Sequence, residues 1–281
     1  MADILKTYVQ KIKELPTLPA IAHEILSLTN DPLLSIDDLM NIIELDPAIS
    51  AKILKVSNSA FFGYPVRTTK LNDAIMRIGV NNVKSIAVGI AVLSFLDDGK
   101  KTTGYMRLYN HSVSVGLTAQ FIASNIKSGI SGDILIDGLL HDLGYLVLHR
   151  YFPDIYREIL KYFENAESLL DAEKDILGYT HADIGFWLAD QWNLPDTVSD
   201  TILYHHYPSL ARNNAKRLAI IHIADYIATK NIYSPIKDDP NYSLDHYAFD
   251  LLSLSDNDLK DMEESIANIP LSDEIFNMPF C

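Results

Sequence analysis

Residues 136–144 read Ile-Asp-Gly-Leu-Leu-His-Asp-Leu-Gly, and this stretch decides how the chain is interpreted. Apolar residues flank the His141-Asp142 pair on both sides, so neither side chain can easily be a solvated surface group. An imidazole and a carboxylate are rarely buried without a partner. Taken alone, the pair fits a structural hydrogen bond and a pair of metal ligands equally well.

Other histidines and aspartates also lie inside, or at the end of, segments with apolar helical periodicity. Each has an ordinary explanation when taken singly. His111 fits a core or capping histidine, Asp225 fits a buried salt bridge, and His205 and His206 fit the favourable C-terminal end of a helix. A shared metal site explains all of them together. The candidate metal ligands are His111, His141, Asp142, His181, His205, His206 and Asp225.

The chemistry of these side chains limits the metal. Neutral imidazoles and carboxylates suit Fe, Mn, Co, Ni or Zn, and ligand softness alone does not choose among them. The single cysteine, Cys281, is the last residue, which disfavours a cysteine-built structural zinc site and excludes an internal disulfide. We expect one or two divalent transition-metal ions, with Fe or Mn favoured. A binuclear site would orient a phosphoryl group for in-line attack by hydroxide.

Composition bounds the class of protein. The chain has 281 residues, of which 48% are hydrophobic, so it can bury a sizeable core. Its net charge of −14 argues against a nucleic-acid surface, which needs Lys and Arg, but not against a small basic pocket for a phosphate. The apolar run 85–96 is too short to span a bilayer, and the N-terminus lacks a signal-peptide core. We expect a soluble, cytoplasmic protein with no nucleic-acid or membrane partner.

Helical periodicity runs through almost every segment, and no segment alternates with a period of two. The expected fold is therefore all-α: two helical bundles followed by a short helical C-terminal tail. The polar, glycine-containing stretch 97–104 is the best boundary, which gives units at 1–100, 101–232 and 233–281. In the second unit, helices are expected near 105–127, 132–149, 152–164, 181–192, 196–206 and 215–230.

Local signals place the helices of the first unit and of the tail. Apolar residues share one face over 5–15, and a second helix is expected over 20–28. Helix starts are expected at a Ser35–Asp38 capping box, at Asp46-Pro47, and at Ser255 with Asp258. Two more helices are expected near 72–78 and 82–96.

The order His, His-Asp, His, His-His, Asp resembles the HD superfamily of metal-dependent phosphohydrolases. The match runs further: residues 45–50 (Leu-Asp-Pro-Ala-Ile-Ser) and 58–63 (Asn-Ser-Ala-Phe-Phe-Gly) resemble the N-terminal half of the HDOD family, the HD-related output domain. Residues 138–144 and 180–185 (Thr-His-Ala-Asp-Ile-Gly) extend the resemblance into the second half. It covers roughly residues 15–232, so that the first two units together form one HDOD module.

Membership of this family implies a bacterial signalling output. Many HDOD modules have lost the HD ligands and act as regulatory domains, whereas this chain retains them. The resemblance implies that one metal is held by His111, His141, Asp142 and Asp225, and a second by His181, His205 and His206, with Asp142 bridging. It also implies other signalling proteins, or a nucleotide, as partners.

The chain departs from the catalytic HD-GYP phosphodiesterases in three places. Tyr145 stands where those enzymes have a lysine, Arg107 stands where three-metal members have an acid, and Tyr207-Pro208-Ser209 replaces their Gly-Tyr-Pro signature.

Two functions therefore remain in competition, and whether the protein is an enzyme stays open. The favoured one is a metal-binding signalling or regulatory module without appreciable turnover. The other is a metal-dependent phosphohydrolase or phosphodiesterase on a nucleotide or phosphodiester, with Asp142 as the bridging ligand of its catalytic centre. A purely structural helical protein with coincidental histidines is the least favoured interpretation.

Overall fold

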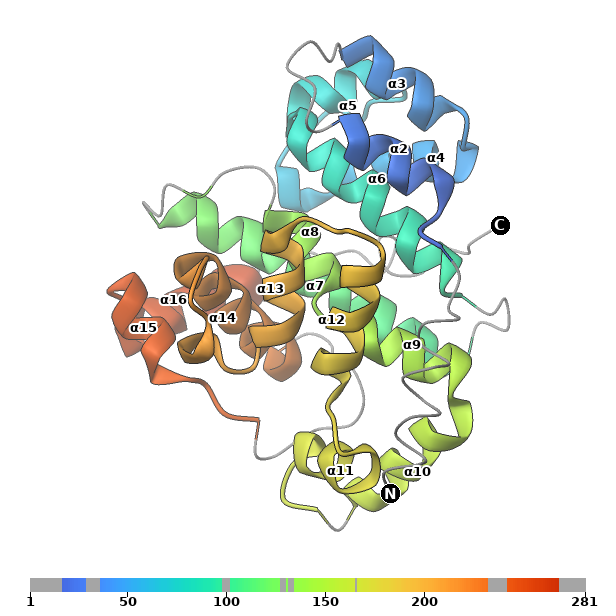
Figure 1. The fold of residues 1–281 in the computed structure, drawn as a ribbon. Helices are drawn as coiled ribbons and strands as arrows, with labels where there is room; N and C mark the ends of the chain where they lie inside the picture. Colours follow the sequence, from blue (N-terminus) through green and yellow to red (C-terminus); the bar gives the residue numbers. More distant parts are fainter. Residues whose placement is uncertain are drawn as a thin grey trace.

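A computed structural model describes residues 17–28, 36–97, 102–126, 130, 134–164, 166–231 and 242–267. All regular secondary structure within these ranges is helical, which confirms the all-α prediction (Figure 1). The predicted helix at 5–15 and the terminal Cys281 lie outside the described residues.

The first group of helices lies together at one end of the molecule (Figure 1). Asp46 accepts hydrogen bonds from the amides of Ala48 and Ile49, and Pro47 occupies the first turn, as the sequence predicts. The helices are α2 Ala20–Leu28, α3 Ile36–Glu44, α4 Pro47–Ser57, the 3₁₀ turn η1 Ala60–Phe62, α5 Leu71–Ile78 and α6 Val80–Phe95.

The second group surrounds a long helix, α7, which packs against α8 and α14. Two short helices follow α14 and pack against it. The helices are α7 Thr103–Asn125, α8 Ile134–Leu140, α9 Leu143–Tyr151, α10 Pro153–Phe163, α11 Leu169–Leu177, α12 His181–Gln191, α13 Asp196–Tyr204, the 3₁₀ turn η2 Pro208–Leu210, α14 Ala215–Asn231, α15 His246–Leu252 and α16 Asp256–Ala267.

Two features differ from the helices expected from sequence. The helix expected over 132–149 is broken at His141 and Asp142, so that α8 ends at Leu140 and α9 begins at Leu143. The structure also contains α11, Leu169–Leu177, which was not predicted from the sequence. Both differences bear directly on the candidate site.

One hydrophobic cluster runs from α2 through α6 into α7–α13, across the predicted boundary at 97–104. A second cluster joins α7 and α14 to the C-terminal helices through Ala248, Phe249, Met262 and Ile266. The C-terminal helices are therefore packed onto α14, and α14 carries one of the candidate ligands.

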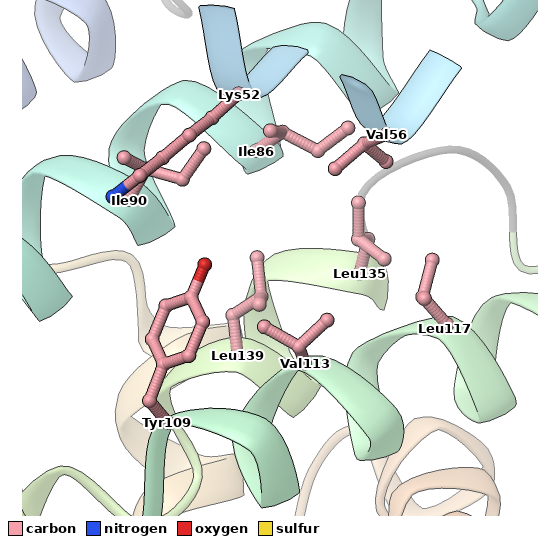
Figure 2. A pocket seen from close by; sticks show the side chains of 9 residues that line it. All are labelled: Lys52, Val56, Ile86, Ile90, Tyr109, Val113, Leu117, Leu135 and Leu139. Carbon is pink, nitrogen blue, oxygen red and sulfur yellow. The ribbon is translucent and has the colours of Figure 1, made fainter. Parts of the chain in front are cut away.

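A cavity lies where the first group meets the second (Figure 2). The ammonium of Lys52 in α4 lies 5.8 Å from the ring centroid of Tyr109 in α7. The other lining side chains, all apolar, come from α4, α6, α7 and α8: Val56, Ile86, Ile90, Val113, Leu117, Leu135 and Leu139.

None of the helices in the described part of the chain is long and apolar enough by itself to cross a membrane. Helices α5 and α6 reach that length and apolarity only as a pair bent by 114°.

Candidate metal centre

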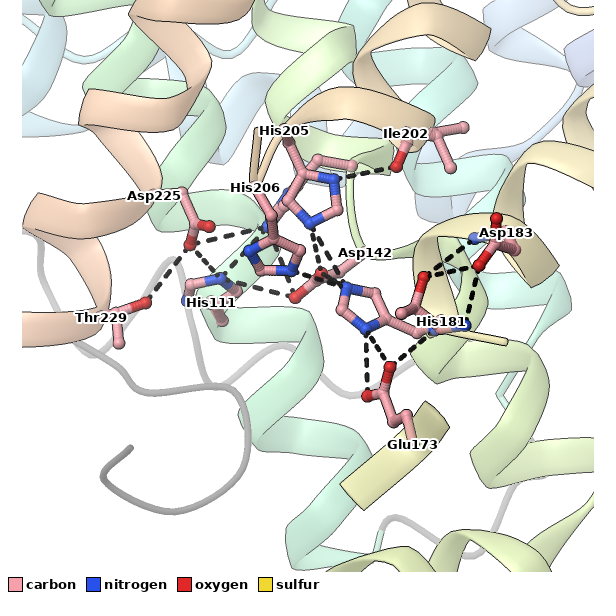
Figure 3. A network of polar contacts seen from close by, with 12 residues as sticks. His111, Asp142, Glu173, His181, Asp183, Ile202, His205, His206, Asp225 and Thr229 are labelled. Carbon is pink, nitrogen blue, oxygen red and sulfur yellow. Dashed lines mark hydrogen bonds and ion pairs between the residues drawn. The ribbon is translucent and has the colours of Figure 1, made fainter. Parts of the chain in front are cut away.

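The structure brings all seven predicted ligands to one centre between α7, α8, α12, α13 and α14 (Figure 3). Four of the histidines are fully buried, His206 is half-buried, and the two aspartates are 2–3% exposed. Groups of their donor atoms lie within 4.8 Å of one another: His181, His205 and His206; His111, His141 and Asp142; and His141, His205 and Asp225.

Asp142 divides the centre into two halves. Its Oδ2 faces the first half, 3.5 Å from Nε2 of His111 and 3.4 Å from Nε2 of His141. Its Oδ1 faces the second half, 3.4 Å from Nε2 of His181 and 3.5 Å from Nε2 of His205. Asp225 completes the first half, with Oδ1 3.0 Å from Nε2 of His111. A carboxylate with one oxygen on each side is arranged to bridge two ions.

In each half, histidine Nε2 atoms face each other. The distance is 3.2 Å between His111 and His141, 3.3 Å between His181 and His205, and 3.0 Å between His181 and His206. Two unprotonated nitrogens at these distances repel, because each presents a lone pair. A proton or a metal ion between them removes the repulsion, so the donor set fits bound cations.

Hydrogen bonds at the opposite ring nitrogen aim three of these histidines. Nδ1 of His141 donates to the Gly138 carbonyl at 2.7 Å, and Nδ1 of His205 donates to the Ile202 carbonyl at 2.9 Å. Nδ1 of His181 lies 2.9–3.0 Å from the Glu173 carboxylate. With Nδ1 as the donor, Nε2 is left to face the centre, which is the usual arrangement of metal-bound histidines.

Burial and neighbouring charges shift the pKa values of the histidines in opposite directions. Burial alone would lower the pKa of His141, yet the charges of Asp142 and Asp225 raise it to about 9. Burial likewise opposes the charge of Glu173 at His181, where the pKa is raised to about 10. Burial and the neighbouring imidazoles lower the pKa of His205 and His206. Each half therefore holds one proton-binding imidazole at the place where a cation fits.

The pKa values of the two aspartates are both lowered. Burial would raise the pKa of Asp142, but the charge of His141 and hydrogen bonds from the histidines hold it well below its usual range. The hydrogen bond from His111 and the charge of His141 do the same for the pKa of Asp225. Both aspartates are thus anionic over the physiological pH range.

Backbone packing explains how two adjacent residues share one centre. The helix breaks at His141 and Asp142, with Asp142 at the N-cap position of α9, so the two side chains do not diverge as they would within one helix. Helix α9 then packs against α12 at Gly144, where an added Cβ would lie 1.8 Å from the His181 carbonyl oxygen. This close contact, which only glycine allows, brings His181 beside Asp142. The capping box of Thr180 and Asp183 starts α12 at His181.

Glu173 was not predicted from the sequence. It is fully buried in α11, its carboxylate lies against Nδ1 of His181, and it also accepts the backbone N–H of His181 at 2.8 Å. A signal was present: Leu169, Glu173 and Leu177 follow at four-residue spacing on one helical face, which places a carboxylate in the apolar stripe. Because helix α11 itself was missed, the stripe was not recognised.

Tyr145 stands beside the same histidine. Its ring stacks on the ring of His181, with centroids 3.8 Å apart and planes inclined by 17°. Its hydroxyl bonds to Glu173, and burial together with the charges of Glu173 and Asp142 raises the pKa of Tyr145 well above its usual range. Tyr145 is therefore a neutral side chain that fixes His181 from its face while Glu173 fixes it from its edge.

The first half is supported from the C-terminal side. Oδ1 of Asp225 accepts a hydrogen bond from Thr229 at 3.2 Å, and Oδ2 accepts one from the hydroxyl of Tyr242. In the described part of the chain, Asp225 therefore contacts His111, Thr229 and Tyr242. Tyr242 was not singled out from sequence, because nothing in its local pattern sets it apart.

The remaining histidines lie outside the ligand set. His222 is buried, and it donates from Nδ1 to the His205 carbonyl at 2.7 Å. His149 contacts Thr102 at 3.0 Å, away from the seven ligands. His23 and His246 are exposed. His222 thus holds the backbone of His205, one of the candidate ligands.

A known protein family matches most of the chain. Residues 15–208 match the HDOD domain family. A protein of Treponema pallidum (strain Nichols), described only as uncharacterized, is 30% identical over 203 residues, which make up 70% of this chain and 38% of that protein. The chain therefore spans well under half the length of that relative.

Solved structures share the fold. An HDOD domain protein of unknown function from Geobacter sulfurreducens has a TM-score of 0.78 at 22% identity, over 96% of this chain and 98% of that one. A candidate phosphohydrolase from Shewanella amazonensis SB2B has a TM-score of 0.74 at 23% identity, over 95% of each chain. A candidate signal transduction protein from Marinobacter aquaeolei VT8 has a TM-score of 0.72 at 23% identity, over 93% of this chain and 58% of that one.

Proposed function

The chain belongs to the HDOD domain family, and we propose that it is a bacterial signalling or regulatory protein whose function depends on two bound divalent transition-metal ions. The proposal rests on one observation above others: the Asp142 carboxylate presents one oxygen to each of two histidine groups. The first half would hold one ion through His111, His141, Asp142 and Asp225. The second half would hold the other through His181, His205, His206 and Asp142.

Buried charge is compatible with two ions. Three buried carboxylates, Asp142, Asp225 and Glu173, belong to the centre. Two divalent ions together with one hydroxide would cancel the three negative charges, whereas a single ion would do so only while the imidazole of the empty half keeps its proton. Uncompensated buried charge is costly. Fe and Mn remain our favoured metals for a site of imidazoles and carboxylates without thiolate.

The surroundings of His181 favour a regulatory role over turnover. In the catalytic relatives that the sequence resembles, a lysine beside the His-Asp pair would stabilise phosphate charge. Here that position is Tyr145, whose ring and hydroxyl are both engaged, with His181 and Glu173 respectively. A neutral, fully engaged side chain offers a phosphate little stabilisation.

A metal-dependent phosphohydrolase is the second candidate, because all seven ligands are present and Asp142 is suited to bridge. Bound ions would supply Lewis acidity and a hydroxide nucleophile near neutral pH. Within the chain, Asp142 and Asp225 would bind and orient, and the raised pKa of His181 would let it hold a proton in the metal-free site. The substrate would be a nucleotide or another phosphodiester.

One experiment separates the two candidates. The protein is reconstituted with Mn²⁺, Fe²⁺ or Zn²⁺, its metal content is measured by elemental analysis, and hydrolysis is assayed over a panel of nucleotides and phosphodiesters. Asp142→Ala is compared with Asp190→Ala, which changes an exposed aspartate in α12. We expect about two ions per chain and no hydrolysis. Hydrolysis that is lost only in Asp142→Ala would establish the enzyme, and a wild type without metal would contradict both candidates.

We further propose a cytoplasmic location and a partner among other signalling proteins or nucleotides. The family supports the first kind of partner, and the acidic overall charge of −14 supports solubility.

A further inference from the structure

The segment from Tyr242 to Ala267 lies beyond the matched HDOD region, which ends at residue 208. We propose that Tyr242 is a positioning residue of the metal centre, and that docking of this C-terminal segment onto α14 is thereby linked to metal binding. The inference rests on the proposed metal-binding function and assigns a role to a part of the chain that the family match does not cover.

Tyr242 acts on the first half of the centre. Its hydroxyl donates to Oδ2 of Asp225, while Oδ1 of the same carboxylate faces Nε2 of His111 at 3.0 Å. A carboxylate held at one oxygen presents the other in a fixed direction. The ring of Tyr242 is itself placed by a stacked contact with Tyr226, at 6.4 Å, and an edge contact with His206, at 5.8 Å. Tyr242 thus touches a ligand of each half.

A second connection reaches the other half. The backbone N–H of Asp245 donates to Nε2 of His222 at 2.7 Å, which fixes the proton of His222 on Nδ1. That Nδ1 donates to the His205 carbonyl at 2.7 Å. The C-terminal segment is therefore connected through His222 to His205, whose Nε2 faces Asp142.

The C-terminal segment also packs on α14 through apolar contacts. Helix α15 begins at an Asp245 cap and packs on α14 through Ala248 and Phe249, and α16 adds Met262 and Ile266. Lys230 at the end of α14 pairs with Glu263 at 3.2 Å. These contacts form a small apolar unit, and its polar links to the centre are Tyr242 and Asp245.

Thermodynamic linkage gives the consequence. If docking of the segment orders Asp225 and His205 for metal binding, then metal binding must stabilise docking by the same factor. Supports of metal ligands typically contribute 10- to 100-fold in metal affinity. Metal loading should accordingly slow hydrogen exchange in 242–267 by a factor of that order, and loss of the Tyr242 hydroxyl should weaken the first ion by a similar factor.

The test uses the full chain and Mn²⁺ or Co²⁺ as the probe. Tyr242→Phe removes only the hydroxyl and keeps the ring contacts, and Tyr247→Phe is the matched control because Tyr247 is 38% exposed in the same segment. Metal affinity is measured by titration with the Co²⁺ absorption spectrum as a second readout, and exchange of 242–267 is followed with and without metal. We expect an affinity loss of at least about tenfold, an altered Co²⁺ spectrum and faster exchange in Tyr242→Phe alone.

Two outcomes would overturn the inference and are distinguishable from each other. A wild type that binds two ions, with equal affinity and exchange in both variants, would reject the role of Tyr242 while leaving the metal centre intact. A wild type that binds no ion at all would reject the proposed function together with the inference.

Discussion

The two halves of the metal centre share Asp142 but are supported in different ways. The first half takes a second carboxylate, Asp225, directly among its donor atoms, and Tyr242 holds that carboxylate from behind. The second half has histidines alone besides Asp142, and its extra carboxylate, Glu173, stands behind His181. The extra negative charge thus lies among the facing donor atoms in the first half, and behind one of the histidines in the second half. We infer that the two positions differ in affinity and in their response to substitution.

Removal of the shared ligand should have the largest effect. Asp142→Ala takes an oxygen from both halves, so we expect loss of both ions at metal concentrations that saturate the wild type. Elemental analysis after dialysis measures this directly. A variant that still retains one ion at wild-type affinity would show that Asp142 serves only one half.

Substitutions in one half should leave the other occupied. Glu173→Gln keeps the size of the side chain but removes the charge behind His181, and we expect the second ion to bind 10- to 100-fold more weakly. Asp225→Asn should instead weaken the first ion. Each titration is compared with Glu158→Gln, an exposed change in α10. Equal weakening of both ions by either variant would contradict separate halves.

Lower pH should weaken metal binding in both halves, because protons compete with the metal for the same nitrogens. In the metal-free protein the raised pKa values, about 9 for His141 and about 10 for His181, mean that both are protonated at pH 7. Each ion must displace one proton, so affinity should rise about tenfold per pH unit up to those values. Calorimetry in buffers of different ionisation enthalpy should register about three protons released at pH 7, one from each of the two imidazoles and one from the water that would become the hydroxide. No proton release would contradict the assigned donors.

The same pKa shifts predict that the stability of the metal-free protein falls as pH rises, whereas metal affinity rises. A pKa raised above the unfolded value of 6.5 adds stability that is complete below about pH 6.5 and is lost as pH rises through 9–10. Thermal unfolding should therefore show metal-free protein losing stability over that range.

The smallest effect is expected at Tyr145. Tyr145→Phe keeps the ring stacked on His181 and removes only the hydrogen bond to Glu173, which is worth about 1 kcal/mol. The second ion should then bind about fivefold more weakly, and the first should be unchanged. A Tyr145→Phe protein with a weakened first ion would show that Tyr145 acts on both halves.

The sequence identified the histidines and aspartates that gather at the centre, but not the residues that support them. His141 and Asp142 stand out because apolar residues surround them, and the order of histidines carries the family resemblance. Glu173 and Tyr242 are brought to the centre by long-range packing, and neither stands beside a ligand in the sequence. The helix break at His141 was also missed, because apolar periodicity continues through it while the close contact at Gly144 is a tertiary one.

Residues that gather at the centre from distant helices can be predicted as a set only where their types are unusual for their surroundings. A buried glutamate in an apolar stripe meets that condition, and a tyrosine in a polar tail does not.

Anomalous diffraction from crystals of the full chain reconstituted with Mn²⁺ or Zn²⁺ tests the central claim most directly. We predict two anomalous peaks, one on each side of the Asp142 carboxylate, the first among His111, His141 and Asp225 and the second among His181, His205 and His206. A single peak, or two peaks on the same side of Asp142, would contradict a bridging aspartate between two halves.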